Sequence, residues 1–194
     1  MAFIHTIPLD EANGPLKEMY DAELQNNGSV DNTAQAFCLR PAVYMAWNNL
    51  LGNIRSNMDV RRYELVTIAA ASRLRCSYCT LAHGEVLRSR FFSAEQVEAI
   101  VQDYHHAGLE SAEVAMMAYA EKIVLNAYKV TPEEIDGLRA HGFSDADILD
   151  IALTAAARSF ISKVIDAVGV EPDEKYMDVE SALRQTLTVG RPFG

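Results

Sequence analysis

Apolar positions recur with a helical period along almost the whole chain. The apolar residues between Val97 and Tyr104 follow the spacing i, i+3, i+4, i+7, and two further stripes cover residues 117–128 and 149–164. This spacing places the apolar side chains on one face of an α-helix. No run of alternating apolar and polar residues is bounded by turn residues, so the pattern predicts no strands. The expected fold class is all-α, a compact helical bundle.

Capping signals give the limits of these helices. Residues 93–96 and 131–134 have the sequence of capping boxes, and the apolar pattern is interrupted where such signals occur. Further candidate N-caps are Asp59, Ser111 and Ser144, and candidate stops are Gly108, Gly142 and Gly169. The predicted helices span 15–25, 34–54, 60–74, 77–90, 94–104, 112–128, 132–140 and 145–168.

The sequence predicts a break in one of these helices and a central position for another. Pro41 lies inside the segment 34–54 and should kink or restart that helix, because proline has no amide hydrogen to donate. The helix 145–168 is apolar on most faces and should be central. We therefore expect one helical domain over residues 1–169, with its core motif at 60–90, followed by a C-terminal arm over 170–194 that packs on the domain or on a neighbouring subunit.

Charge and composition exclude several classes of protein. The 194 residues carry a formal net charge of −10, which argues against binding to nucleic acid or to an anionic membrane surface. No apolar run approaches the ~18 residues of a spanning helix, and residues 1–8 lack the basic start of a signal peptide. Three cysteines are too few for a secreted disulfide framework. We expect a cytoplasmic protein whose paired cysteines are catalytic or bind metal.

The segment from Glu64 to His83 carries the candidate chemistry. Cys76 and Cys79 have C-x-x-C spacing at the start of a predicted helix, where free N–H groups and the helix dipole favour a thiolate. Cys79 and His83 are four residues apart and share a helix face, so the imidazole can take the thiol proton. In one continuous helix Glu64 and His83 would lie ~28 Å apart. They come level only if the chain reverses near Arg75, where the sequence has no glycine or proline.

Other readings of the same residues remain open at this point. The two cysteines can be buried side chains that only fill space, or a redox switch without catalysis. A zinc site of Cys76, Cys79 and His83 would need a fourth ligand. The candidates for that ligand are Glu64, His105 and Cys38. A thioredoxin-like site is disfavoured because no βαβ pattern surrounds the motif.

Glu64, eleven intervening residues, Cys76-Ser-Tyr-Cys79, three more residues and His83 resemble the signature of the alkylhydroperoxidase D (AhpD)-like proteins. These belong to the carboxymuconolactone decarboxylase superfamily. The segment 7–12, Arg40-Pro41 and the C-terminal arm are similar to its peroxidase-related branch. The resemblance implies an all-α fold, homo-oligomers and thiol-dependent reduction of peroxides. It also implies that Cys76 and Cys79 are the redox pair, His83 the proton relay and Glu64 the base behind it.

The expected cycle uses the two thiols themselves, with no cofactor and no bound metal. Cys79 shares a face with His83, so we expect it to attack the peroxide and Cys76 to resolve the sulfenic acid, although the reversed assignment stays open. An external dithiol, either a lipoyl group or a thioredoxin-type protein, would then reduce the disulfide. One position departs from the resemblance: Tyr78 stands where members often carry a second histidine.

Overall fold

The structure is a computed structural model that describes residues 2–193, so that Met1 and Gly194 lie outside it. Within this range the chain forms only helices and no strand, which confirms the all-α class. None of the described helices is long and apolar enough to cross a membrane. The α-helices are α1 (Gly14–Asn27), α2 (Asn32–Ala36), α3 (Pro41–Arg55), α4 (Val60–Leu74), α5 (Ser77–Arg90), α6 (Ala94–Asp103), α7 (Ser111–Asn126), α8 (Pro132–Ala140), α9 (Asp145–Ala167) and α10 (Ser181–Leu187). Short 3-10 helices lie at η1 (Leu9–Glu11), η2 (Tyr104–His106), η3 (Ala127–Lys129) and η4 (Glu174–Asp178).

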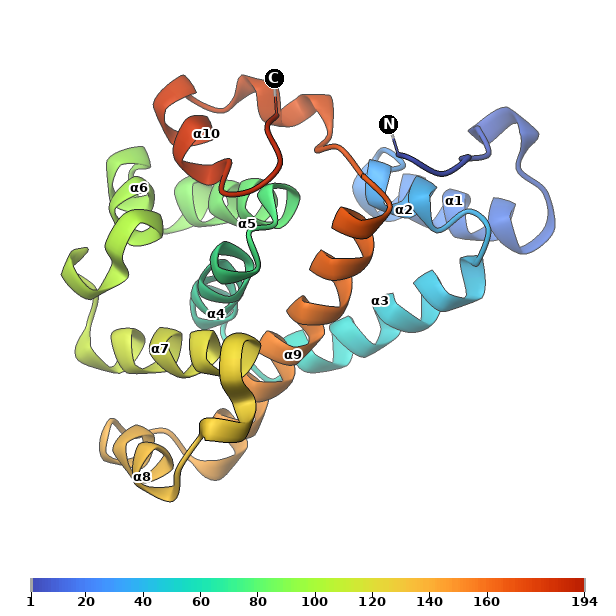
Figure 1. Cartoon of the computed structure of the whole chain (residues 1–194). Helices are drawn as coiled ribbons and strands as arrows, with labels where there is room; N and C mark the ends of the chain where they lie inside the picture. Colours follow the sequence, from blue (N-terminus) through green and yellow to red (C-terminus); the bar gives the residue numbers. More distant parts are fainter. Residues whose placement is uncertain (1, 194) are drawn as a thin grey trace.

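Helix α4 is the centre of the molecule. Nine consecutive residues, Tyr63–Ala71, are buried, which requires neighbours on every side of the helix. Those neighbours are α5, α7 and α9, and α10 closes the bundle over α5 and α6 (Figure 1). Helix α3 lies on the other side of α9, next to α1 (Figure 1).

The buried side chains form two clusters that differ in content. The larger cluster surrounds α4, α6, α7 and α10 and includes no cysteine. The second cluster lies between α1–α3, α9 and the start of α5, and it contains all three cysteines. The candidate dithiol is therefore enclosed by the second cluster.

The predicted helix limits agree closely with the structure for the two helices of the motif. The predicted helices 60–74 and 77–90 have the bounds of α4 and α5. The expected restart at Pro41 is confirmed, because α2 ends at Ala36 and α3 begins at Pro41. The N-cap prediction at Ser111 is wrong by one residue, since Glu110 holds that position. The C-terminal arm contains η4 and α10, which the pattern did not predict.

Helix α9 is central, as predicted, but the apolar stripe that predicted it is not its buried face. Leu149, Leu153 and Phe160 are 59%, 40% and 45% exposed, whereas Ile151 and Ile165 are each 1% exposed. Because the helix is apolar on most faces, its sequence indicates a helix without indicating its rotation about its own axis. That rotation decides which α9 side chains reach the cysteines.

Candidate active site

The chain reverses between α4 and α5 at a single left-handed residue. Arg75 has φ 57° and ψ 37°, a conformation that non-glycine residues adopt at a cost of about 1–2 kcal/mol. The amide of Arg75 donates to the carbonyl of Ser72 at 3.0 Å, and the amide of Cys76 donates to that of Ala71 at 3.1 Å. These bonds end α4, and α5 begins one residue after Cys76. The reversal that the motif needs is thus present without glycine or proline.

The helical hairpin brings Glu64 and His83 into contact. Nδ1 of His83 and Oε2 of Glu64 lie 2.6 Å apart, and the Glu64 side chain is only 3% exposed against 18% for His83. The ring of Tyr63 meets the imidazole edge-on, with 6.2 Å between the ring centroids. With Nδ1–H donating to the carboxylate, the other ring nitrogen is left free to accept a proton.

Cys76 and Cys79 lie at the start of α5 as free, buried cysteines. The thiol of Cys76 donates a hydrogen bond to the sulfur of Cys79, which raises the pKa of Cys76 well above its usual range and lowers that of Cys79 well below it. Burial raises both pKa values. For Cys79, however, the nearby charges of Arg158 and His83 add to the lowering. Cys79 is therefore the sulfur of the pair that ionises more readily.

Helix α9 contributes two polar side chains to this sulfur. Nη1 of Arg158 lies 3.6 Å from Sγ of Cys79, and the hydroxyl of Ser162 donates to the same sulfur at 3.3 Å. Nη2 of Arg158 donates to the hydroxyl of Tyr63 at 3.4 Å. Arg158 and Ser162 are 5% and 1% exposed, so these contacts are shielded from water.

Asp166, two turns further along α9 from Arg158, lies beside the other cysteine. Burial raises the pKa of its carboxyl group, and a hydrogen bond with the thiol of Cys76 opposes that rise. A carboxylate in this position can accept the Cys76 proton. Arg158, Ser162 and Asp166 recur every four residues along α9 and so share one face of the helix. That polar stripe is the signal from which the sequence analysis could have found them.

Tyr78 stands where the AhpD-like proteins often carry a histidine, and it contacts the C-terminal segment, residues 170–193. Its hydroxyl donates to the carboxylate of Asp173, and its ring lies edge-on to that of Tyr176 with centroids 6.2 Å apart. Burial, followed by the charge of Asp173, raises the pKa of Tyr78 well above its usual value. The residue thus connects α5 to the C-terminal segment as a neutral hydrogen-bond donor.

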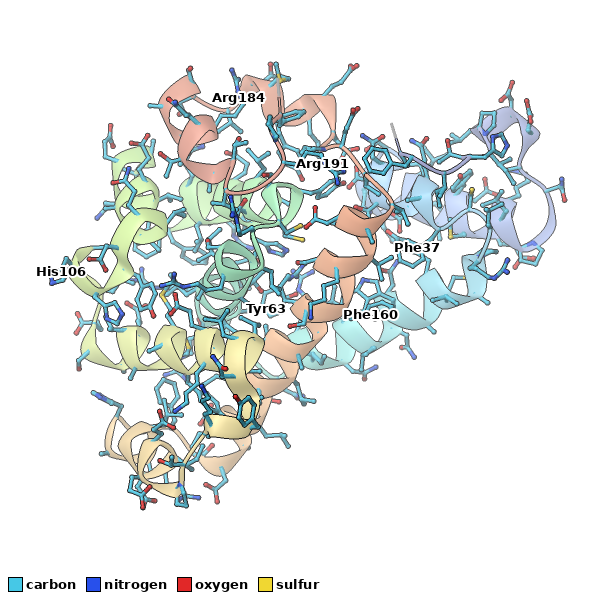
Figure 2. The ribbon with its side chains drawn as sticks, viewed as in Figure 1. Phe37, Tyr63, His106, Phe160, Arg184 and Arg191 are labelled. Carbon is cyan, nitrogen blue, oxygen red and sulfur yellow. The ribbon has the colours of Figure 1, made fainter. Side chains whose placement is uncertain are left out.

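The last residues of the chain cover the start of α5. The hydroxyl of Ser77 donates to the carbonyl of Arg191 at 2.8 Å and accepts from the amide of Gly190 at 3.0 Å. A Cβ at Gly190 would lie 1.7 Å from the carbonyl oxygen of Arg75, so only glycine allows this approach. Arg191 reaches the end of α9, where it donates to the carbonyl of Asp166 at 2.9 Å (Figure 2). Cys76 is consequently fully buried.

Of the three fourth ligands considered for a zinc site, Glu64 contacts His83, whereas Cys38 and His105 have other partners. Cys38 accepts the amide of Ile7 at 3.3 Å, and His105 stacks on Tyr104 beside α6. Over residues 2–193 no group of three or more histidine, cysteine, aspartate or glutamate side chains is arranged to hold a metal ion.

Residues 41–122 match the model of the carboxymuconolactone decarboxylase family. No characterised protein sequence matches the chain. Among solved structures, the AhpD-core, peroxidase-related protein of Ralstonia eutropha JMP134 is similar, with a TM-score of 0.82 and 21% identity over 90% of this chain and 94% of that one. A peroxidase-related protein of Silicibacter sp. TM1040 has a TM-score of 0.77 and 22% identity, over 89% and 94% of the two chains. The debrominase Bmp8 has a TM-score of 0.72 and 19% identity, over 95% of each chain.

Proposed function

We propose that this AhpD-like protein of the carboxymuconolactone decarboxylase superfamily is a thiol-dependent peroxidase that reduces hydrogen peroxide or alkyl hydroperoxides. The observation that carries the proposal is the convergence of two different pairs. A low-pKa sulfur, Cys79, has a second thiol, Cys76, hydrogen-bonded to it, and His83 stands four residues further along α5 in contact with Glu64 of α4. A thiolate, a resolving thiol and a proton relay are what peroxide reduction by cysteine requires.

In the first step the thiolate of Cys79 attacks one peroxide oxygen. The S–O bond forms as the O–O bond breaks, and the departing alkoxide takes a proton from His83 and leaves as an alcohol. In the second step Cys76 loses its proton and attacks the sulfenic sulfur. The S–O bond breaks, water leaves, and a disulfide joins the two cysteines. An external dithiol then reduces the disulfide and is itself oxidised, so each cycle consumes one peroxide and one dithiol.

The test is steady-state consumption of an organic hydroperoxide with a panel of dithiol donors that includes lipoyl groups and thioredoxin-type proteins. We expect turnover with at least one donor and its complete loss in Cys79→Ser. Cys38→Ser is the matched control, because Cys38 is also buried but has the amide of Ile7 as its hydrogen-bond partner, and this variant should retain full activity. A disulfide that forms without turnover under any donor would instead support a redox switch, and stoichiometric zinc in the purified protein would support a metal-binding module.

The order of attack is tested separately by mass spectrometry after a brief peroxide pulse. We expect a sulfenic acid on Cys79 in the Cys76→Ser chain. A sulfenic acid that appears only on Cys76, in the Cys79→Ser chain, would reverse the two roles.

A second candidate function is reductive dehalogenation, favoured by the similarity to the debrominase Bmp8, whose C82A variant is known in complex with 2,3,4-tribromopyrrole. A thiolate that attacks bromine breaks the C–Br bond and leaves a carbanion, which takes a proton. The second thiol then displaces bromide from sulfur and forms the same disulfide. Release of bromide from a brominated pyrrole, with no consumption of hydroperoxide, would favour this activity over the first.

We also propose that the chain forms homo-oligomers, as the resemblance implies. The surface that fits a second copy is a groove between α3 and α9 whose lining side chains are all apolar, including Val43, Leu50, Leu153 and Phe160. These four are at least 40% exposed, and an exposed apolar patch of this kind marks an interaction site. Light scattering should show that Phe160→Glu dissociates the assembly while Tyr128→Glu, an equally drastic change at an 83% exposed residue elsewhere, does not.

A further inference from the structure

We propose that Arg158 and Ser162 of α9 form an anion site that holds the sulfur of Cys79 as a thiolate, which makes both of them catalytic residues. The proposal deepens the peroxidase function and rests on it for its purpose. The two side chains are one helical turn apart, so both reach the same point on α5, at 3.6 Å and 3.3 Å from the sulfur.

The charge of Arg158 has no other obvious reason to be buried. Among the described residues, none of the ion pairs that include an aspartate or glutamate involves Arg158. Its Nε also has no hydrogen-bond partner there. An isolated buried cation is costly, and proteins pair such a charge or bind an anion to it. The sulfur of Cys79 and the hydroxyl of Tyr63 are the only acceptors recorded for its guanidinium in this part of the chain.

The electrostatics of the guanidinium agree with this pairing. Burial alone lowers the pKa of Arg158, but electrostatic attraction to Cys79, Tyr63 and Glu64, together with the hydrogen bond to Cys79, more than offsets the effect, so its pKa lies above the usual value. The stabilisation is mutual, since the same contact lowers the pKa of Cys79. Other titratable groups also face the sulfur or its neighbours. They are Cys76 and His83 at α5, Tyr63 and Glu64 on α4, and Asp166 on α9.

The test follows the ionisation of Cys79 in a full-length chain that carries Cys38→Ser and Cys76→Ser. Cys79 is then the only thiol, and the ultraviolet absorbance of its thiolate is titrated with pH against the same chain carrying Cys79→Ser as a blank. Adding Arg158→Met should raise the midpoint by about 1–3 pH units, the usual effect of losing an opposite charge at this range. Arg158→Lys should restore part of the shift, and Ser162→Ala should raise the midpoint by less than Arg158→Met does.

Arg55→Met is the matched control, because its guanidinium lies over the ring of Tyr63, 5.1 Å from the centroid, and makes no recorded contact with the cysteine. Its removal should leave the midpoint in place. An unchanged midpoint in a folded Arg158→Met chain would overturn the proposal. If circular dichroism shows that the Arg158→Met chain is unfolded, the Ser162→Ala chain replaces it, and an unchanged midpoint there would overturn the proposal.

The titration needs no peroxide, so its outcome is independent of the proposed function. A low midpoint that depends on Arg158 in a protein without peroxidase activity would overturn the function and leave the anion site. If the protein is a fully active peroxidase but the titration midpoint of Cys79 is the same with and without Arg158, the function would stand and the anion site would be overturned.

Discussion

The two sides of helix α9 differ in character, because the inner side combines buried isoleucines with polar groups while the outer side exposes large apolar side chains. The side that faces the core carries Arg158, Ser162 and Asp166, which lie against the dithiol. The side that faces outward carries Leu149, Leu153 and Phe160, each at least 40% exposed. A helix buried for packing alone would carry no charged side chain on its inner face and would not leave its leucines exposed. The inner face of α9 fills the core with isoleucines such as Ile151 and also presents a buried arginine to Cys79.

The largest expected effect comes from the relay on the dithiol side. His83→Ala should slow peroxide oxidation of Cys79 by about 10²–10⁴-fold, the usual contribution of general acid–base catalysis. It should also shift the pH–rate profile upward, because the imidazole no longer handles the proton. Stopped-flow oxidation across a pH series measures both effects.

His106→Ala is the control for this prediction. Its side chain is 84% exposed and pairs with Asp103 at 2.6 Å, so the substitution should change neither rate nor profile. A pH–rate profile that is identical in wild type and His83→Ala would remove His83 from the mechanism.

The second prediction compares how much the inner and outer faces of α9 contribute to the free energy of unfolding. Ile151→Ala, on the inner face at 1% exposure, should lower the free energy of unfolding by about 2–5 kcal/mol through lost burial and a residual cavity. Leu149→Ala, on the outer face, should change it by no more than about 0.5 kcal/mol. Urea unfolding of both chains decides the matter, and equal losses would mean that the two faces do not differ as described.

The third prediction concerns the C-terminal segment that covers Cys76. Gly190→Ala places a Cβ against the carbonyl of Arg75, and the segment must shift at a cost of about 1–3 kcal/mol. We expect faster alkylation of Cys76 and faster proteolysis of the C-terminal residues.

Gly137→Ala serves as the matched control, since its Cβ would meet nothing within 4 Å. In the interior of α8 this change should stabilise the chain slightly, by about 0.5–1 kcal/mol. If Gly190→Ala leaves Cys76 as protected as Gly137→Ala does, the segment is not what covers the thiol.

The last prediction concerns the pH dependence of stability that Cys79 contributes. Its pKa is lowered in the folded chain, so the folded state binds fewer protons than the unfolded state between that pKa and the ~8.5 of a free thiol. The contribution is complete above the unfolded pKa and is lost as the pH falls through the folded one. Within that window the stability of the reduced chain should rise with pH by about 1.4 kcal/mol per unit relative to Cys79→Ser. The free energy of unfolding of both chains is measured by urea titration at a series of pH values. If it changes with pH in the same way in both chains, the pKa of Cys79 is not lowered in the folded state.

Local sequence was sufficient for most of the helical framework and for the residues of the motif. Capping side chains act within one turn, so the capping boxes at Ser93 and Thr131 and the N-caps at Asp59 and Ser144 mark helix starts in the structure as they do in the sequence. The spacing of Glu64 and His83 also made their contact a definite expectation, on the condition that the chain reversed between them. That condition carried no sequence signal, because the residue that supplies the left-handed turn is Arg75.

What only the tertiary structure decided is the rotation of α9 and the course of the C-terminal segment. When a helix has apolar residues on most faces, its own sequence does not determine which face turns toward the core. The choice is made by the summed packing of α3, α4 and α7 against it, and this choice brings Arg158 and Ser162 to Cys79. The segment that covers Cys76 is likewise positioned by long-range contacts, Gly190 at Arg75 and Tyr78 at Asp173, which join residues about a hundred positions apart. Periodicity and capping are local properties, so they could predict the helices and the thiols but not the charge beside the thiolate.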